Sequence, residues 1–141
     1  KNWHKTLSNT VACYILSNCI TFGMIHIVKS FKYAIDGIKE AYISEKNMKV
    51  HFLLMILAIV LAVILKLSSV EWAILVVTIG LVLILEFINT SLEQIVDIVS
   101  PEKQEKAKIA KDVAAAGVLI AAIIAILVGI FLFVPKCING I

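Results

Sequence analysis

The 141-residue sequence contains no arginine, only two prolines, six isolated glycines and three widely spaced cysteines. Three scattered cysteines cannot form a disulfide framework, and without a Cys-x-x-Cys pair they do not suggest a metal site. The glycine-rich loop of P-loop nucleotide-binding proteins is absent, and so is the glycine-rich loop of protein kinases. These absences argue against a disulfide-rich secreted domain and against the common soluble folds that bind nucleotide phosphates.

Hydrophobic residues, by contrast, make up 61% of the chain, and the mean hydropathy of +1.01 is well above that of a soluble domain. About 20 apolar residues cross the hydrocarbon of a bilayer. Three segments are apolar enough to do so, at about 50–65, 71–99 and 110–134. The intervening 66–70 segment only reverses the chain, and Pro101 ends the second span. The sequence predicts a single all-α integral membrane domain with three transmembrane helices.

The lysines are concentrated on one side of these spans. Of the lysines from residue 28 onward, Lys66 and Lys136 lie on one side of the spans, whereas the other nine lie on the opposite side, shortly before the first span or around the second loop. Because cytoplasmic loops of membrane proteins carry an excess of positive charge, we expect the N-terminal region and the second loop to be cytoplasmic. Trp72 then falls at the outer interface. The nine lysines are Lys29, Lys32, Lys39, Lys46, Lys49, Lys103, Lys106, Lys108 and Lys111.

Residues 28–44 have the pattern of an amphipathic helix. Phe31, Ile35, Ile38 and Tyr42 recur at helical spacing, and charged residues occupy much of the remainder. We expect this helix to lie on the inner membrane surface with its lysines toward anionic headgroups. A solvated helix that covers the bundle fits the same pattern.

Residues 1–23 show neither a signal peptide nor helical periodicity. We expect the natural protein to start at Met24, with residues 1–23 as an extension of uncertain status. An additional hydrophobic anchor over 11–27 is the alternative.

One stripe of the second span is polar. At about 100° per residue, Glu86, Asn89, Glu93 and Asp97 fall within a sector of about 60° on one helix face. Glu86 is the deepest of the four, and the stripe opens toward the cytoplasm. Carboxylates inside a membrane are costly and by default mark a functional site. A carboxylate that only bonds a neighbouring helix is the simpler explanation for Glu86.

The residues of this stripe also carry a resemblance. They resemble the signature of the prokaryotic diacylglycerol kinase family, which consists of small integral membrane lipid kinases, and further matches follow in the family's order over about 28–136. Some of these matches resemble the Gram-positive branch, whose characterised members resemble undecaprenol kinases more than diacylglycerol kinases. The signature is Glu86-x-Ile88-Asn89-Thr90-Ser91-Leu92-Glu93-x-x-Val96-Asp97; the family matches are Phe31-Lys32-Tyr33-Ala34-x-x-Gly37 and Ala110-Lys111-Asp112-x-Ala114-Ala115; the branch matches are Glu45-Lys46-Asn47 with His51, Asn89-Thr90, and Phe133-Val134-Pro135-Lys136.

The resemblance implies a membrane lipid kinase domain over 24–141, in the plasma membrane of a bacterium, with its active site in the cytoplasm. The implied reaction is ATP- and Mg²⁺-dependent phosphorylation of a lipid hydroxyl, most directly of undecaprenol to undecaprenyl phosphate. Diacylglycerol, which would yield phosphatidic acid, is the alternative acceptor. A small ion-coupled transporter would explain Glu86, but not the polar groups on the cytoplasmic side of it. No nucleic-acid partner is implied.

The resemblance also assigns roles to the stripe. Glu86 would be the catalytic general base that accepts the proton of the lipid hydroxyl. Glu45 and Glu93 would bind Mg²⁺, since hard cations take carboxylate oxygens. Asn89 would orient Glu86 or a phosphate oxygen, and an interhelical hydrogen bond is its alternative. An ion pair with a neighbouring lysine, Lys46 or Lys49, is the alternative for Glu45.

The remaining candidates would contact the nucleotide. Lys111 would neutralise developing phosphate charge and Asp112 would hold the nucleotide, with Asp97 as a further polar contact. Gln104 stands where the family often carries His near the adenine. The simpler explanation for two of them is that Lys111 anchors its helix at the membrane surface and Asp97 is its partner.

Small residues on the third span allow helices to approach closely. The family is trimeric with active sites between subunits, so the resemblance implies a homotrimer that shares its sites. These small residues are Ala110, Ala114, Ala115, Ala116 and Gly117.

Overall fold

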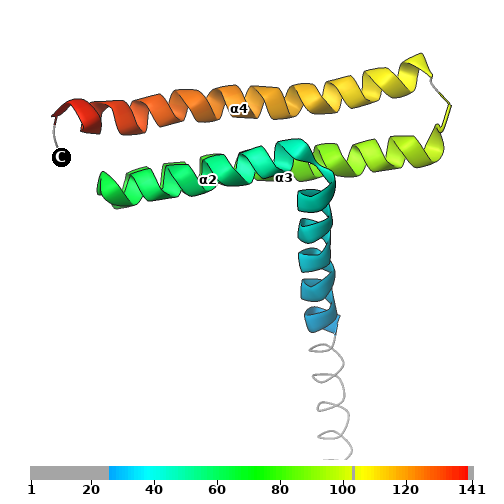
Figure 1. The fold of residues 1–141 in the computed structure, drawn as a ribbon, viewed down its shortest axis with the longest axis horizontal. Helices are drawn as coiled ribbons and strands as arrows, with labels where there is room; N and C mark the ends of the chain where they lie inside the picture. Colours follow the sequence, from blue (N-terminus) through cyan, green and yellow to red (C-terminus); the bar gives the residue numbers. More distant parts are fainter. Residues whose placement is uncertain (1–25, 103, 140–141) are drawn as a thin grey trace, which may run out of the picture. The chain divides into compact units, whose positions relative to one another are not determined.

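The computed structural model describes residues 26–102 and 104–139, and every regular element in that part of the chain is helical. Three helices are α2 (Lys46–Ile64), α3 (Ser69–Val99) and α4 (Glu105–Asn139). A further helix, without a label in Figure 1, occupies 26–44. The predictions about 1–23 and a start at Met24 lie outside the described residues.

Each of α2, α3 and α4 is long and apolar enough to cross a membrane. The prediction of an all-helical chain with three spans is therefore confirmed. The helices extend beyond the predicted spans because the prediction counted only apolar residues. The charged 105–111 segment consists mostly of strong helix formers and belongs to α4. Pro135 lies near the end of α4, where its missing N–H removes only one hydrogen bond of the helix.

The turn between α2 and α3 is held by backbone and side-chain caps. The N–H of Leu67 donates to Ala62 O over 3.1 Å and the N–H of Lys66 to Val63 O over 3.2 Å, with Lys66 at a φ of 49°. This pattern is a Schellman motif, which closes the last turn of α2. At the start of α3, Ser68 and Glu71 form a reciprocal capping box. The turn is therefore as short as the sequence predicts, and both adjoining helix ends are satisfied.

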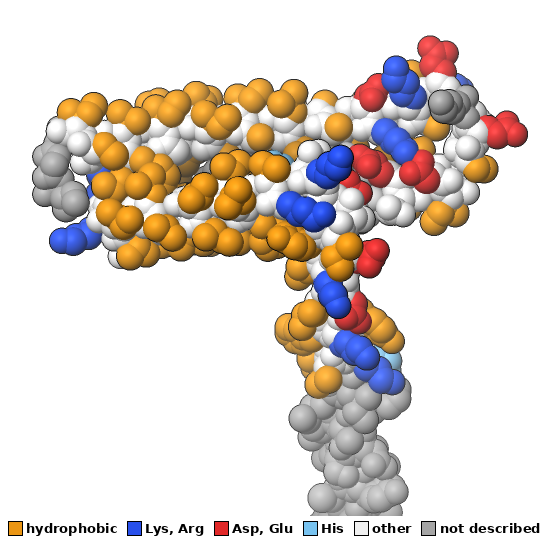
Figure 2. Space-filling model, viewed as in Figure 1, with side chains coloured by type: hydrophobic (Ala, Val, Ile, Leu, Met, Phe, Trp, Pro, Cys, Tyr) orange, Lys and Arg blue, Asp and Glu red, His pale blue; other side chains and the backbone are white. Residues whose placement is uncertain are grey.

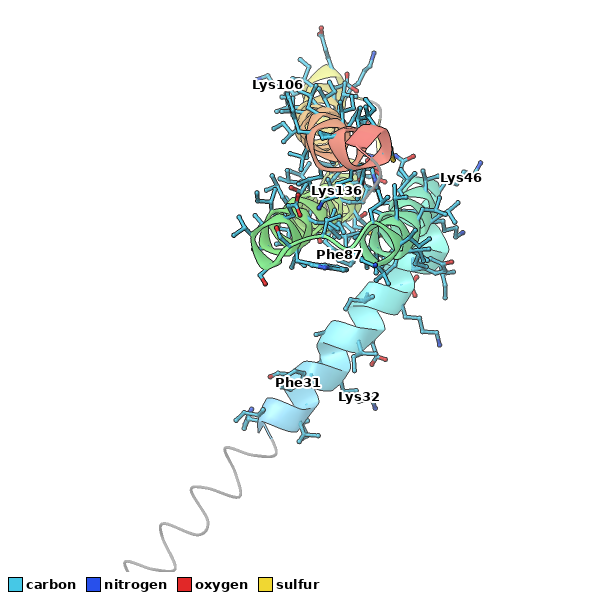
Figure 3. The ribbon with its side chains drawn as sticks, turned by 90° about the vertical axis from the view of Figure 1, so that its left-hand side faces the viewer. Phe31, Lys32, Lys46, Phe87, Lys106 and Lys136 are labelled. Atoms are coloured by element: carbon cyan, nitrogen blue, oxygen red, sulfur yellow. The ribbon has the colours of Figure 1, made fainter. Side chains whose placement is uncertain are left out.

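The three helices pack as a bundle in which α3 contacts α4 far more than either contacts α2. Seen along the helices, α4 lies on one side of the pair formed by α2 and α3 (Figure 3). A cluster of buried residues lies where the α2–α3 turn meets the end of α4, which we call the hairpin end. There Lys136 Nζ lies 3.1 Å from Glu71 Oε2. The cluster comprises Ala62, Leu65, Leu67, Leu75 and Leu132.

Most of the bundle surface is hydrophobic. Figure 2 shows orange side chains over the visible faces of α2, α3 and α4, whereas charged side chains gather where α3 ends and α4 begins, which we call the loop end. Only 11%, 28% and 17% of the most apolar windows of α2, α3 and α4 are buried within the chain. Lipid or other protein must therefore cover the greater part of each span.

Residues 26–44 form a helix, as the sequence predicts for 28–44. Apolar Phe31 and Ile35 are 67% and 62% exposed, and Lys32 is exposed too. The Ser30 hydroxyl donates to the carbonyl oxygen of His26 over 2.9 Å. The location of this helix at a membrane surface stays a prediction.

Candidate active site

Glu86 is the most deeply buried acidic residue of the described chain. Its side chain is only 1% exposed, although it belongs to a helix whose outer face is largely open. Its Oε2 has no hydrogen-bond partner among the described residues, and His51 Nε2 on α2 lies 4.0 Å away. A buried carboxylate without a partner is costly unless a ligand satisfies it. The structure thus contains no helix-to-helix hydrogen bond that would account for this oxygen.

Two neighbours of Glu86 on α3 are also buried and only partly satisfied. The Asn89 amide nitrogen donates to Glu93 Oε1 over 2.9 Å. In the described structure, the Asn89 Oδ1 and Thr90 Oγ1 atoms have no hydrogen-bond partner. The amide nitrogen of Asn89 is therefore bonded to Glu93, and the predicted role of Asn89 toward Glu86 or a phosphate oxygen stays a prediction.

Glu45 is the half-buried residue that separates the 26–44 helix from α2. Its backbone N–H donates to Ala41 O over 3.0 Å, while its side chain makes no capping bond to α2. Lys49 donates instead to the carbonyl oxygen of Ile43, over 3.0 Å. Among the described residues no ion pair joins Glu45 to a lysine, so the simpler explanation for this residue lacks support.

The carboxylates of Glu45 and Glu93 are close enough to act electrostatically on that of Glu86. In the described part of the chain, no lysine is ion-paired with any of these three carboxylates. No cluster of three or more His, Cys, Asp or Glu residues close enough to hold a metal ion occurs within 26–102 and 104–139. Mg²⁺ commonly takes only one or two carboxylates and completes its shell with phosphates and water. Glu45 and Glu93 would supply that number of carboxylates.

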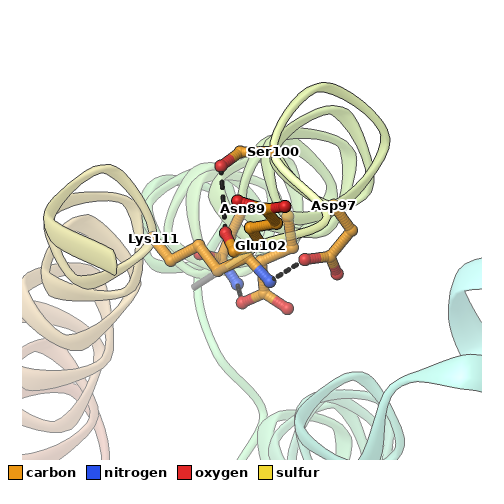
Figure 4. Close-up of polar contacts among 6 residues, drawn as sticks. Asn89, Asp97, Ser100, Glu102 and Lys111 are labelled. Carbon is orange, nitrogen blue, oxygen red and sulfur yellow. Dashed lines mark hydrogen bonds and ion pairs between the residues drawn. The ribbon is translucent and has the colours of Figure 1, made fainter. Parts of the chain in front are cut away.

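A second group of predicted residues lines a surface hollow of about 710 Å³ at the loop end. Asp97, Gln104, Lys111 and Asp112 all contribute to it, and its volume is within the range of small-molecule pockets. Lys111 Nζ is ion-paired with Asp97 Oδ1 (Figure 4). The ion pair of the simpler explanation is therefore present, whereas the role of Lys111 as a membrane-surface anchor stays a prediction. Asn89 is not part of the hollow.

The Ser100 hydroxyl donates to the carbonyl oxygen of Glu102 over 3.2 Å and gives the α3–α4 loop a local bond (Figure 4). Gln104 and Asp112 are exposed at the hollow. The predicted site residues thus form two groups, one buried around Glu86 and one exposed at the loop end.

A family model described as "Prokaryotic diacylglycerol kinase" matches residues 32–133, which include every candidate residue. The chain belongs to this family. Together with three apolar helices, the family identifies a bacterial membrane protein, and the names of family and relatives indicate a lipid kinase, which implies ATP as co-substrate.

Several curated relatives of the family align with most of the chain. It is 40% identical to a diacylglycerol kinase of Synechocystis sp. over 115 residues, 35% identical to the undecaprenol kinase of Bacillus subtilis over 108, and 33% identical to the diacylglycerol kinase of Escherichia coli K12 over 107. These alignments cover 81%, 77% and 76% of this chain, and 66%, 88% and 88% of the respective relatives. The names of the relatives are divided between two lipid acceptors.

The sequence did not predict that the Thr90 hydroxyl would be buried without a partner, nor that His51 would lie close to Glu86. Thr90 is four residues after Glu86, so helical spacing alone places it on the same face. No role was predicted for its hydroxyl, because it is neither a charged group nor an amide. His51 lies on a different helix, and its proximity to Glu86 depends on how α2 is aligned against α3, which no pattern within either helix reveals.

Proposed function

We propose that the protein transfers the γ-phosphoryl group of ATP to the hydroxyl of a membrane lipid, with undecaprenol as the acceptor. The observation that carries this proposal is the buried, unpartnered carboxylate of Glu86 at the centre of a family-matched polar cluster. A carboxylate in that state can accept a proton from a substrate hydroxyl without first giving up a protein partner.

In the proposed reaction the Glu86 carboxylate takes the proton as the lipid oxygen bonds to the γ-phosphorus, and the bond from that phosphorus to the β–γ bridging oxygen breaks to release ADP. Glu45 and Glu93 would hold Mg²⁺, which when bound neutralises charge on the phosphates. The amide of Asn89 keeps Glu93 oriented through the hydrogen bond described above.

The nucleotide would lie at the loop end, in the hollow lined by Gln104 and Asp112. Lys111 would exchange its partner, Asp97, for the phosphates. Such an exchange is inexpensive because both side chains of this ion pair are partly exposed, at 33% and 63%. Asp97 and Asp112 then remain as polar contacts for the nucleotide or for Lys111.

The choice of undecaprenol rests on the resemblance of 45–47, His51 and 133–136 to the Gram-positive branch. The relative named undecaprenol kinase, 88% of which is aligned with this chain, supports it. Diacylglycerol is the second candidate, because the Synechocystis relative of that name has the higher identity, 40%.

The test is transfer of label from γ-labelled ATP by the purified protein in mixed micelles with Mg²⁺, offering undecaprenol and diacylglycerol in parallel. Glu86→Gln should reduce transfer by about 10²- to 10⁴-fold, the usual contribution of a general base. Glu71→Gln is the matched control, because Glu71 lies on the same helix at the hairpin end and should retain activity. Preferential labelling of diacylglycerol would overturn the proposed acceptor, and no labelling of either lipid by folded protein would overturn the kinase proposal in favour of the transporter.

We further propose a homotrimer that shares its active sites, with the loop end in the cytoplasm and the 26–44 helix on the inner membrane surface. The small buried share of each span supports assembly, since much of the apolar surface is available to other copies. A Cβ added at Gly117 would meet no atom of this chain within 4 Å, so nothing within the described chain requires glycine there. Crosslinking in native membranes should trap trimers, and Gly117→Leu should reduce them; dimers without trimers would contradict the proposal.

A further inference from the structure

His51 has no part in the reaction proposed above, yet it lies close to the unpartnered oxygen of Glu86. It lies in the second turn of α2, and its Nε2 is 4.0 Å from Glu86 Oε2. The two side chains are only 15% and 1% exposed. Water therefore has little access to the space between them.

His51 also lines a cavity of about 270 Å³ between α2, α3 and α4. Apart from His51 and Thr78, the residues that line this cavity are apolar or glycine. The Thr78 hydroxyl is already used, because it donates to the carbonyl oxygen of Ile74 over 2.8 Å. An imidazole beside such a cavity needs a polar partner. Glu86 Oε2, which needs a donor, lies 4.0 Å from the imidazole Nε2.

The distance of 4.0 Å is longer than a hydrogen bond. Catalytic hydrogen bonds are often long in the absence of substrate and shorten when it binds. We propose that His51 is a positioning residue whose Nε2–H donates to Glu86 Oε2 in the substrate complex. Glu86 Oε1 is then turned toward the lipid hydroxyl and accepts its proton. This inference rests on the general-base role proposed for Glu86.

Such a bond would act on turnover more than on substrate binding. A carboxylate held by one oxygen cannot rotate away from the hydroxyl, and misplacement of a reacting group by about 1 Å can cost about 10²-fold in rate. His51 touches neither Glu45 nor Glu93 by any bond found in the described chain, so its replacement leaves the proposed Mg²⁺ ligands in place. The expected signature is a lower kcat with an unchanged KM for ATP.

The experiment compares three variants with the full-length wild type in mixed micelles. His51→Phe keeps a ring but has no N–H, His51→Gln keeps an N–H donor, and Met55→Leu changes another residue that lines the same cavity, one turn further along α2. We expect His51→Phe to lower kcat by about 10- to 100-fold with the KM for ATP within about twofold of wild type. The kcat of His51→Gln should be within about fivefold of the wild-type value, and the kcat of Met55→Leu should equal the wild-type value.

Thermal unfolding and a double variant separate positioning from a merely structural role. In the Glu86→Gln background, His51→Phe should cause no further loss of activity, because the two residues act as one unit.

The inference is overturned if His51→Phe turns over at the wild-type rate, or if His51→Phe and His51→Gln lose activity equally and in proportion to lost folded protein. Normal transfer by both the wild type and His51→Phe would refute this inference alone. No transfer by the wild type would refute the proposed function, and this inference with it.

Discussion

At the scale of single residues, the two groups of polar side chains differ in what a ligand must displace. Glu86 and Thr90 have buried oxygens without a partner, so a ligand that bonds them removes a cost already present in the protein. Asp97 and Lys111 are partly exposed and paired, so a ligand must compete with an existing but weak ion pair. The chain thus has a buried site with unsatisfied oxygens and an exposed site whose ion pair a ligand can replace.

The exposed pair yields the first prediction. Lys111→Met should raise the KM for ATP about tenfold or more, since a lysine that neutralises phosphate charge supplies about 1.4 kcal/mol or more of binding. Asp97→Asn should change it by less than about threefold. Neither substitution should lower the free energy of unfolding by more than about 1 kcal/mol, because the ion pair is exposed. ATP titrations of activity and thermal unfolding measure both, and equal effects of the two substitutions on KM would contradict the assigned roles.

A second prediction concerns the hydrogen bond from Asn89 to Glu93. Asn89→Ala leaves Glu93 unoriented, and loss of such a supporting partner typically weakens metal binding by about 10- to 100-fold. The Mg²⁺ concentration at half-maximal activity should rise accordingly. Ser91→Ala is the control on the same helix, since the Ser91 hydroxyl only donates to the carbonyl oxygen of Phe87. A reduced kcat with an unchanged Mg²⁺ dependence would show that Asn89 does not act through the metal site.

The buried part of the site could be predicted from the sequence only where its members share a helix. Glu86, Asn89 and Glu93 lie on one face of α3 because helical periodicity puts them there. Neither periodicity nor composition could predict the approach of His51 to Glu86, because it depends on packing between two helices. The pairing of Lys111 with Asp97 could be foreseen as an alternative, since both residues flank one short loop.

At the scale of elements, hydropathy predicted the number of helices correctly but not their ends. Hydropathy reports only the part of a helix that faces hydrocarbon, whereas the helix continues as long as its backbone bonds are satisfied. The first turns of α4 are polar, and α2 starts at Lys46, four residues before the predicted apolar span. This difference matters for function, because Glu45 and Gln104 both lie outside the predicted spans.

The capping box at the start of α3 yields a third prediction. Ser68→Ala removes the side-chain acceptor for the N–H of Glu71 and should lower the free energy of unfolding by about 0.5 to 2 kcal/mol. Turnover should be unchanged, because this cap belongs to the hairpin end. Ser69→Ala is the neighbouring control, since Ser69 is exposed and makes no capping bond. Denaturation in detergent micelles measures the difference; equal stability of the two variants would refute the contribution of the cap.

At the scale of the whole molecule, orientation in the membrane provides a fourth prediction. The positive-inside rule puts Cys137 outside and Gln104 inside, and Cys137 is exposed in the structure. With Cys13 and Cys19 replaced by serine, a membrane-impermeant maleimide should label Cys137 in intact cells. In a variant that carries Gln104→Cys as its sole cysteine, labelling should require disrupted cells. The reverse pattern would invert the proposed topology.

The contact between α3 and α4 has one ion pair at each end, Glu71 with Lys136 at the hairpin end and Asp97 with Lys111 at the loop end. In the proposed reaction only the second pair is exchanged. Substitutions at the hairpin end could therefore stabilise the enzyme without lowering its turnover. Lys66 is the obvious place to begin, because its φ of 49° suits glycine, and Lys66→Gly should raise the melting temperature by an amount that corresponds to about 0.5 kcal/mol.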